Sequence, residues 1–355
     1  MARNTFGHLL TITTFGESHG PAIGVIVDGV PSGIAITEAE IQVDLDRRRP
    51  GQSAVTTPRK ESDTVEILSG VFEGVTTGAP VSLLIRNEGQ RSTDYSKIKD
   101  SFRPGHADFT YFTKYGIRDY RGGGRSSGRE TACRVAAGAI AKKYLAHLGV
   151  SVIAYTKAVG DIQAEVIDYQ EIERNAVRCP DAQKAKEMEA LIKEIRGTGD
   201  SIGGVLEAVV TGCPVGLGEP LYDKLDAMLA YGVMSIGAIK GVEIGLGFAH
   251  SNLKASQTND AFHMEGDRVR TETNHCGGIL GGISTGEDIV LRAVIKAPSS
   301  ITVEQNTVDI EGQPEVIQVH GRHDPCLCPR AVPVLEAMIA LVIADAYLMM
   351  KAYAQ

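Results

Sequence analysis

Residues 121–131 combine three consecutive glycines, two serines and three arginines, and they lead directly into an alanine-rich stretch at residues 132–148. Consecutive glycines let a backbone approach a ligand closely, and the unsatisfied N–H groups of a helix start attract anions. Each charge-assisted hydrogen bond from Arg125 or Arg129 to a phosphate or carboxylate contributes roughly 1.5–3 kcal/mol. We therefore predict an anion-binding loop at a helix start, in preference to a glycine-rich connection with solvated arginines.

Two histidines lie in glycine-bounded turns. His19 belongs to the segment Gly-Glu-Ser-His-Gly at residues 16–20, and His106 follows a Pro-Gly pair at residues 104–105. A Pro-Gly pair builds a turn, so we expect His106 to project from a loop. Because the unperturbed pKa of histidine is about 6.5, such a side chain can give a proton to a departing oxygen near neutral pH. A bound phosphate would raise that pKa further.

The segment at residues 16–20 also fits the Gly-x-Ser-x-Gly pattern of a serine-hydrolase nucleophile elbow. That elbow requires a strand before the serine and a helix directly after it. Residues 22–27 are instead rich in β-branched side chains and predict a second strand. We interpret the segment as a tight turn that exposes Ser18 and His19 to a cavity, and we keep a serine hydrolase as a minor alternative.

Two further segments carry polar groups in turns. Asp324 lies in Gly-Arg-His-Asp-Pro-Cys at residues 321–326, and Lys-Ala-Pro-Ser-Ser at residues 296–300 offers a cation and two hydroxyls. Taken alone, Asp324 is typical of a capping or turn residue, because the following proline favours extended backbone. Glycine pairs at residues 277–278 and 281–282 predict another segment where the backbone approaches a neighbouring group closely.

Composition narrows the ligand class. The chain has 36 basic and 44 acidic residues and a net charge of -8, which argues against a nucleic acid or a membrane as the main partner. Arginines nevertheless gather at residues 47–49, with Arg59 and Lys60 nearby, and again at residues 118–134. Local positive charge on an acidic protein favours a small, multiply anionic molecule held in a cleft.

Length and cysteine use set further limits. A chain of 355 residues fits one large domain or two smaller ones, and a hydrophobic content of 43% is enough for a core. We expect no apolar run of about 18 residues, no leader and a cytoplasmic protein. The six cysteines form no Cys-x-x-Cys pair, so we expect reduced structural thiols and no metal.

The predicted elements mix strands and helices without a regular βαβ order. This favours an α+β fold with largely antiparallel sheets. Helices are expected where Thr37 and Glu40 form a capping box, from Pro180 to about Arg196, from Pro220 to Gly232, and at residues 334–350 after Pro333. Strands are expected at residues 9–14, 22–27, 81–85, 150–154, 205–211 and 289–295. The Rossmann and Walker glycine patterns are absent from the sequence.

Five segments, in this order, together resemble the chorismate synthase family over nearly the full chain. They are Gly-Glu-Ser-His-Gly, Asp-Arg-Arg-Arg-Pro-Gly, Phe-Arg-Pro-Gly-His-Ala-Asp, Asp-Tyr-Arg-Gly-Gly-Gly-Arg-Ser-Ser-Gly-Arg-Glu-Thr and Gly-Arg-His-Asp-Pro-Cys. The resemblance implies conversion of 5-enolpyruvylshikimate 3-phosphate to chorismate by 1,4-anti elimination of phosphate and a ring proton. It also implies reduced FMN (FMNH2) as cofactor, which lends electron density to the substrate and recovers it without net oxidation.

The resemblance also implies roles for individual residues. His106 would lie near the leaving phosphate, His19 near the pyrimidine edge of the flavin, and Asp324 near flavin nitrogen 5. The hydroxyls of Ser18 and Ser127 would orient these groups. The residues expected to line the FMN site are Arg125, Ser126, Ser127, Gly237, Ala238, Gly281, Lys296, Ala297, Pro298, Ser299, Ser300 and Arg322. Arg48, with Arg49, Arg129 and Arg134, would meet the substrate anions.

Three positions depart from the family's common pattern. Ala54 stands where relatives often have arginine, Gly128 replaces a usual alanine, and Ala297 interrupts a common Lys-Pro-Thr-Ser-Ser segment. Arg59 or Lys60 would have to compensate for the first. The other two changes affect side chains expected to contribute only backbone contacts, so we expect no loss of activity from them.

The family fold implied is a single domain over residues 1–355, a β-α-β sandwich in which antiparallel sheets enclose helices, assembled as a homotetramer. A non-catalytic anion- or flavin-binding protein with the same fold remains an alternative. The sequence leaves open whether the chain reduces its own flavin with NADPH, as some relatives do. Because no nicotinamide motif is visible, we favour an external reductant.

Overall fold

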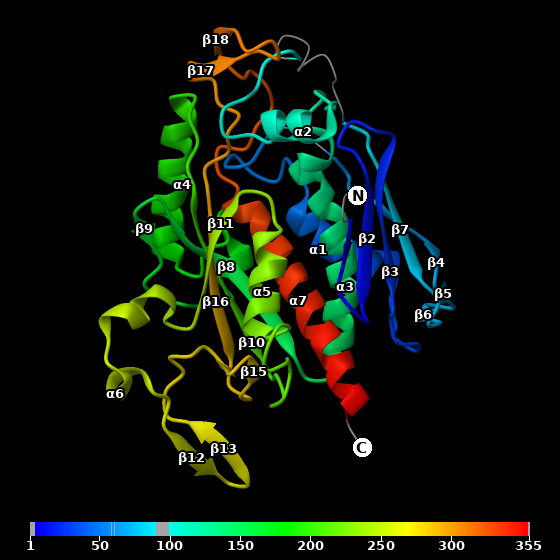
Figure 1. Ribbon diagram of the computed structural model, residues 1–355, viewed down its shortest axis with the longest axis vertical. Helices are drawn as coiled ribbons and strands as arrows, with labels where there is room; N and C mark the ends of the chain where they lie inside the picture. Colours follow the sequence, from blue (N-terminus) through cyan, green and yellow to red (C-terminus); the bar gives the residue numbers. More distant parts are fainter. Residues whose placement is uncertain (1–3, 58, 60, 90–98, 354–355) are drawn as a thin grey trace.

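Two five-stranded antiparallel sheets enclose a layer of helices (Figure 1). The structure is a computed structural model, and it describes residues 4–57, 59, 61–89 and 99–353. Lys60 therefore lies outside the described residues. This arrangement confirms the expected α+β sandwich and its antiparallel pairing.

The first sheet has the strand order β1-β2-β3-β7-β4. Alternate residues of β7 face the helices, because Val81, Leu83 and Ile85 are buried while the residues between them are not. This period of two is what buries one face of a strand. The strand bounds are β1 (Thr5–Phe6), β2 (Thr11–Gly16), β3 (Ala22–Asp28), β7 (Val81–Arg86) and β4 (Val65–Ser69).

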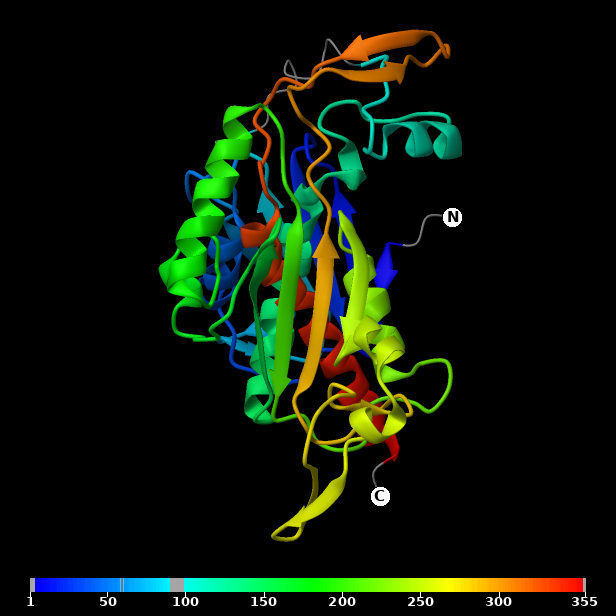
Figure 2. The same ribbon diagram turned by 90° about the vertical axis from the view of Figure 1, so that its left-hand side faces the viewer.

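The second sheet has the order β11-β16-β10-β8-β9, and Figure 2 shows it face on with α4 along one edge. The central strand β10 pairs with β16 without a register shift, and Val205 lies opposite Val294. Ile289, Leu291 and Ile295 of β16 all point into the core. The strand bounds are β11 (Ile239–Ile244), β16 (Ile289–Ile295), β10 (Gly204–Thr211), β8 (Ser151–Val159) and β9 (Ile162–Gln163).

The helices α1, α3, α5 and α7 lie between the sheets, while α2, α4 and α6 lie outside that layer (Figure 1). Their bounds are α1 (Glu38–Arg48), α2 (Asp108–Tyr115), α3 (Thr131–His147), α4 (Ala182–Gly197), α5 (Leu225–Met234), α6 (Ala255–Thr258) and α7 (Cys328–Tyr353). The described residues also form four two-stranded hairpins. They are β5 (Val71–Phe72) with β6 (Val75–Thr76), β12 (Phe262–Glu265) with β13 (Arg268–Thr271), β14 (Ile279–Leu280) with β15 (Ile283–Ser284), and β17 (Gln305–Val308) with β18 (Pro314–Ile317).

The expected starts of α1 and α4 are confirmed, whereas the expected starts of α5 and α7 are wrong. Thr37 and Glu40 form the capping box at the start of α1, and Asp181 caps α4 one residue after Pro180. The expected helix from Pro220 begins only at Leu225, because residues 219–223 form a turn in which Glu219 N donates to Asp223 O. Gly232 does not end α5 but lies buried within it, where a Cβ would be 3.1 Å from Val342 Cγ2.

The helix α7 begins earlier than expected, since Pro333 lies inside it instead of before it. Proline has no N–H to donate to the carbonyl four residues back, which here is that of Pro329. The side chain of Arg178 supplies the missing donor, because its Nη1 lies 2.6 Å from Pro329 O. A bond from a residue about 150 positions away thus lets the helix pass through the proline.

The expectation that no segment is apolar enough to span a membrane is wrong for α7. An 18-residue window of this helix has a mean hydropathy of 1.9 and few charges, so by length and composition it passes that test. Within the fold, 78% of the window is buried, which is the pattern of a core helix.

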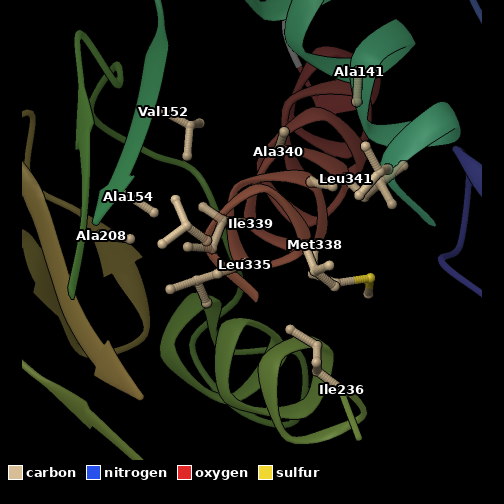
Figure 3. Packing of buried hydrophobic residues seen from close by; sticks show 14 of the residues in the cluster. Ala141, Val152, Ala154, Ala208, Ile236, Leu335, Met338, Ile339, Ala340 and Leu341 are labelled. Atoms are coloured by element: carbon tan, nitrogen blue, oxygen red, sulfur yellow. The ribbon is translucent and has the colours of Figure 1, made fainter. Parts of the chain in front are cut away.

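The side chains of α7 fill the core between the helices and the second sheet. Leu335 and Ile339 face the small residues Ala154 and Ala208 of β8 and β10, and Met338 points toward Ile236 (Figure 3). Small residues on the strands leave room for the larger side chains of the helix, as close packing requires. All six cysteines are free, and Cys276 alone among them is not fully buried.

Candidate active site

A cavity of about 710 Å³ opens where α3 and α7 begin. The unsatisfied N–H groups and dipoles of two helix starts make this region favourable for anions. The expected site residues that line it are Arg48, His106, Arg125, Ser126, Ser127, Arg129, Arg134, Gly237, Ala238, Lys296, Ala297, Pro298, Ser299, Ser300, Arg322 and Asp324. Residues more than 270 positions apart in sequence thus meet at one place.

Four expected site residues, Ser18, His19, Arg49 and Gly281, do not line the cavity. Arg49 is exposed and pairs with Asp46 at 3.4 Å. Gly281 forms the turn of the β14–β15 hairpin, with a φ of +60°, and a Cβ there would meet no atom within 4 Å. Their assigned roles stay predictions.

The turn between β2 and β3 forms as expected, but it buries its side chains. Ser18 and His19 are 2% and 6% exposed, and Ser18 Oγ lies 2.9 Å from His19 Nδ1. Gly122, which lines the cavity, covers them: a Cβ there would be 2.4 Å from His19 Cε1. The expectation that both face the cavity is therefore wrong, because the glycine-rich loop packs between them and it. Since a strand follows the turn, the nucleophile elbow is absent too.

The glycine-rich loop needs its glycines. Gly122, Gly123 and Gly124 all have positive φ, at +70°, +90° and +54°, a region that favours glycine. A Cβ on Gly123 would lie 2.9 Å from His106 Cε1, so the loop and the histidine turn are in close contact. After two short 3-10 turns, at Gly124–Ser126 and Gly128–Glu130, the chain enters α3.

The two arginines of this loop that were expected to hold the anion, Arg125 and Arg129, already have partners within the protein. Arg125 donates to Thr14 Oγ1 at 2.7 Å and to Gly16 O at 3.1 Å, which anchors the loop to β2. Arg129 forms an ion pair with Asp63, and its Nε lies 2.8 Å from Asn87 Oδ1. The expectation that both arginines together hold a ligand is therefore not met by their present contacts.

Asp63 joins Arg129 to Arg48 in a buried cluster. Asp63 Oδ2 lies 3.0 Å from Arg48 Nη2, and the side chains of Asp63 and Arg48 are 0% and 1% exposed. Burial acts to raise the pKa of Asp63, but the charges of Arg48 and Arg129 outweigh it and hold that pKa below its usual value. Burial lowers the pKa of Arg48 to about 9, with Asp63 opposing the shift, so Arg48 remains charged at neutral pH.

His106 lies in a second cluster. His106 Nδ1 is 2.8 Å from Asp108 Oδ1 and 3.0 Å from Arg103 Nη2. The turn itself forms as expected, because His106 N donates to Arg103 O and Gly105 has a φ of +69°. Burial lowers the pKa of His106, and Arg103 and Lys296 add to that effect while Asp108 opposes it.

Lys296 connects the histidine turn with the segment that follows β16. Its Nζ lies 2.5 Å from Gly105 O and 3.0 Å from Ser299 Oγ. Its backbone N donates to Ala238 O at 2.9 Å, and Ala238 has an unusual φ of +71°. A positive φ on a residue other than glycine is strained and marks a backbone held in place by its surroundings.

Asp324 is held on both carboxylate oxygens. Thr57 N donates to Oδ1 at 2.8 Å, and Arg330 Nη1 lies 2.5 Å from Oδ2. Arg134, also on the cavity wall, pairs with Glu130 at 3.0 Å and donates to Ser235 Oγ at 2.6 Å. Arg59, one of the two cations expected to compensate for Ala54, lies on the cavity wall and pairs with Glu61, so its charge is already matched by a carboxylate.

Sequence reasoning missed the acidic partners of the arginines. Asp63 lies in none of the quoted segments, and neither does Arg330, the cation that holds Asp324. Glu130 lies in the glycine-rich segment, but its pairing with Arg134 was not anticipated. Asp108 could have been identified from the sequence as a partner of His106, because it follows His106 by two residues within the segment Phe-Arg-Pro-Gly-His-Ala-Asp. A histidine and an aspartate so close together in a turn are a signal that would have found this pair.

Comparison with known proteins identifies a family for this chain. A model of the family described as chorismate synthase matches residues 10–348. A chorismate synthase of Methanocella arvoryzae is 56% identical over 350 residues, covering 97% of this chain and 94% of its own, and one of Roseiflexus castenholzii is 56% identical with 97% of each chain covered. A crystal structure of chorismate synthase superposes with a TM-score of 0.76 at 32% identity, covering 98% of this chain and 93% of that one. This chain therefore belongs to the chorismate synthase family and is a lyase of aromatic amino acid biosynthesis.

Proposed function

We propose that this enzyme removes phosphate and a ring proton from 5-enolpyruvylshikimate 3-phosphate in a 1,4-anti elimination that yields chorismate, the last step of the common shikimate pathway. Reduced FMN, when bound, supplies electron density to the breaking carbon–oxygen bond without net redox change. The observation that carries the proposal is the convergence of His106, Asp324 and several cations on one cavity beside two helix starts.

The residues present suit an FMN molecule. The cavity volume of about 710 Å³ lies within the range of cofactor sites, roughly 300–1,000 Å³. Its wall offers the hydroxyls of Ser126, Ser127, Ser299 and Ser300 together with the Lys296 ammonium. The bond from Lys296 N to Ala238 O ties two of the expected flavin-binding segments to each other, so they can hold one ligand between them.

The charge of the site suits the substrate, which carries two carboxylates and a phosphate. Burying such anions without counter-charges would be prohibitive. Among the described residues of the cavity wall, Lys296 and Arg125 have only neutral oxygens as side-chain partners and no carboxylate. Their positive charge is therefore not cancelled by the protein itself, and it is available to a bound anion.

The proton steps fall to two groups on the wall. His106 would donate a proton to the departing phosphate oxygen, a role that contributes roughly 10²–10⁴-fold to a rate. The Asp324 carboxylate, held by Thr57 N and Arg330, would assist removal of the ring proton beside flavin nitrogen 5. His19 and Ser18 lie behind Gly122, so they would reach the flavin only if the glycine-rich loop moved.

Phosphate release under anaerobic conditions tests the proposal. Wild-type protein with reduced FMN and substrate should release phosphate, and His106→Ala should lower turnover by about 10²–10⁴-fold while flavin binding survives. His147→Ala, which removes an exposed histidine at the end of α3, should leave turnover unchanged. Absence of phosphate release by the wild type would favour a non-catalytic flavin-binding protein, and unchanged turnover in His106→Ala would remove His106 from the chemistry.

The same proposal includes a single domain over the whole chain, a homotetramer and a cytoplasmic location, with no nucleic acid or membrane partner. It also includes dependence on an external flavin reductant. The match of the family over residues 10–348 supports the single domain. The assay run with and without NADPH tests the reductant, and light scattering of the purified protein tests the tetramer.

A further inference from the structure

Asp108, at the first position of α2, lies directly behind His106 as seen from the cavity. Its side chain is 3% exposed, whereas that of His106 is 19% exposed and lines the cavity. Asp108 accepts from Arg103 at both oxygens, with distances of 2.7 Å to Oδ2 and 2.9 Å to Oδ1, and Arg118 Nη1 lies 3.5 Å from Oδ1. The carboxylate is therefore fixed in position before it meets the imidazole.

His106 Nδ1 lies within hydrogen-bond distance of one acceptor and one donor. Asp108 Oδ1 at 2.8 Å can only accept a hydrogen bond, whereas Arg103 Nη2 at 3.0 Å can only donate one. Arg103 Nη2 already has an acceptor in Asp108 Oδ1. If Nδ1 were bare, its lone pair would face the carboxylate at 2.8 Å, so the contact is favourable only when Nδ1 carries the proton.

A proton on Nδ1 decides what the other ring nitrogen can do. In the neutral ring Nε2 is then bare, and in the charged ring Nε2 carries the second proton. The ring faces Gly123, since a Cβ there would lie 2.9 Å from Cε1 and 3.4 Å from Nε2. The cavity-side nitrogen can therefore donate only from the imidazolium.

We propose that Asp108 is a positioning residue that fixes the tautomer of His106 and stabilises its imidazolium, so that Nε2 can deliver a proton to the leaving phosphate. This inference rests on the proposed function of His106. In the step, the Nε2–H bond breaks and its electron pair stays on Nε2, while an O–H bond forms on the phosphate. The neutral ring keeps Nδ1–H on Asp108, ready to be protonated again at Nε2.

The surroundings show why the carboxylate is needed. The charged groups that act on His106 are Asp108 and Arg103 from its own turn and Lys296 from the segment after β16, and a fourth charged group, Arg118, lies behind the carboxylate. Three of these four are cations, and burial also disfavours the imidazolium. Asp108 is the group that opposes them, so its removal should lower the pKa of His106 further.

Nitrogen NMR of histidine-labelled wild-type protein gives a test that needs no variant. At pH values above the titration of His106, the neutral ring should show a protonated Nδ1 and a bare Nε2. A neutral ring protonated on Nε2 would overturn the proposal.

Asp108→Asn removes the charge and keeps the shape. We expect the His106 titration, and the alkaline limb of phosphate release at saturating substrate, to move down by about 1–3 pH units. Turnover at neutral pH should fall about 10–1,000-fold, because the imidazolium fraction falls about tenfold for each pH unit of the shift. Asp226→Asn, which removes a carboxylate paired with Lys224 at the start of α5 and absent from the cavity wall, is the matched control and should change neither quantity.

The outcomes separate this inference from the proposed function. If His106→Ala abolishes turnover but Asp108→Asn moves neither the titration nor the pH profile, the role of Asp108 is wrong and that of His106 stands. If His106→Ala keeps full turnover, the proposed function of His106 fails first. A purely structural role for Asp108 would lower the stability of the variant without changing the tautomer or the pH profile.

Discussion

Two buried clusters border the cavity, and each places one aspartate between two arginines. In the first, Asp63 contacts Arg48 and Arg129, and in the second, Asp108 contacts Arg103 and Arg118. Both carboxylates have a pKa below the usual value, because their partners outweigh the effect of burial. These partners are Arg48 and Arg129 for Asp63, and Arg103 together with His106 for Asp108. The second cluster differs by one group, the imidazole of His106.

That one group changes what the cluster can do. The first cluster carries one net positive charge, from two arginines and one aspartate, and it contains no group that titrates near neutral pH. It can shape and charge the wall but cannot move a proton. The second cluster changes its charge when His106 titrates, so the same arrangement becomes a means of handling a proton.

Asp63→Asn should have the largest effect on stability. It leaves Arg48 and Arg129 buried beside a neutral amide, and breaking a buried ion pair from one side costs about 3–5 kcal/mol. Denaturant unfolding should show this loss. Glu66→Gln, which removes the exposed partner of Arg86, is the matched control and should cost at most about 1 kcal/mol. A loss as small as that of the control would show that the first cluster contributes little to the fold.

The stability difference between wild type and Asp63→Asn should depend on pH. Because the pKa of Asp63 is lowered in the folded state, its stabilisation is fully present above the unfolded carboxyl pKa of about 3.9. It is lost as the pH falls through the folded pKa. Unfolding free energies should therefore differ by a constant amount from pH 7 to about pH 5 and converge below about pH 4. A difference that grows on acidification would contradict the assigned charge of Asp63.

The strands were the most predictable part of the fold. The strand expected at residues 289–295 has the same two ends as β16 in the structure, and its residues alternate in burial along its length. The start of α7 was not predictable, because the carbonyl freed by Pro333 is satisfied by Arg178, far away in sequence. The start of α5 was missed for a different reason, since a local turn replaced the helix that Pro220 favoured.

In the site too, local features could be predicted from the sequence and long-range contacts could not. The motifs predict which groups gather at the cavity, because glycines, histidines and arginines in turns have local signatures. They do not predict which cations are already neutralised. Asp63 lies 66 residues before Arg129 in the chain, and no local pattern connects the two. The burial of His19 likewise depends on how the loop at Gly122 packs over it.

The glycine-rich loop touches both clusters and gives the smallest expected effects. At one end, Gly123 has a φ of +90° and a Cβ would meet His106 Cε1, so Gly123→Ala should cost about 1–3 kcal/mol and displace the histidine. At the other end, Gly128 accepts from Arg48 Nη1 at 3.3 Å through its carbonyl, and a Cβ there would meet nothing within 4 Å. Gly128 has no positive φ, so Gly128→Ala should stabilise the protein by about 0.4–1 kcal/mol through the unfolded chain.

Thermal unfolding and phosphate release of the two alanine variants compare the ends of the loop directly. Gly123→Ala should lower both the melting temperature and turnover, because its methyl group acts on the cluster that handles the proton. Gly128→Ala should raise the melting temperature slightly and leave turnover unchanged, because the carbonyl that Arg48 uses stays in place. Equal losses of turnover in both variants would mean that the loop acts as one rigid unit and that the two clusters are coupled through it.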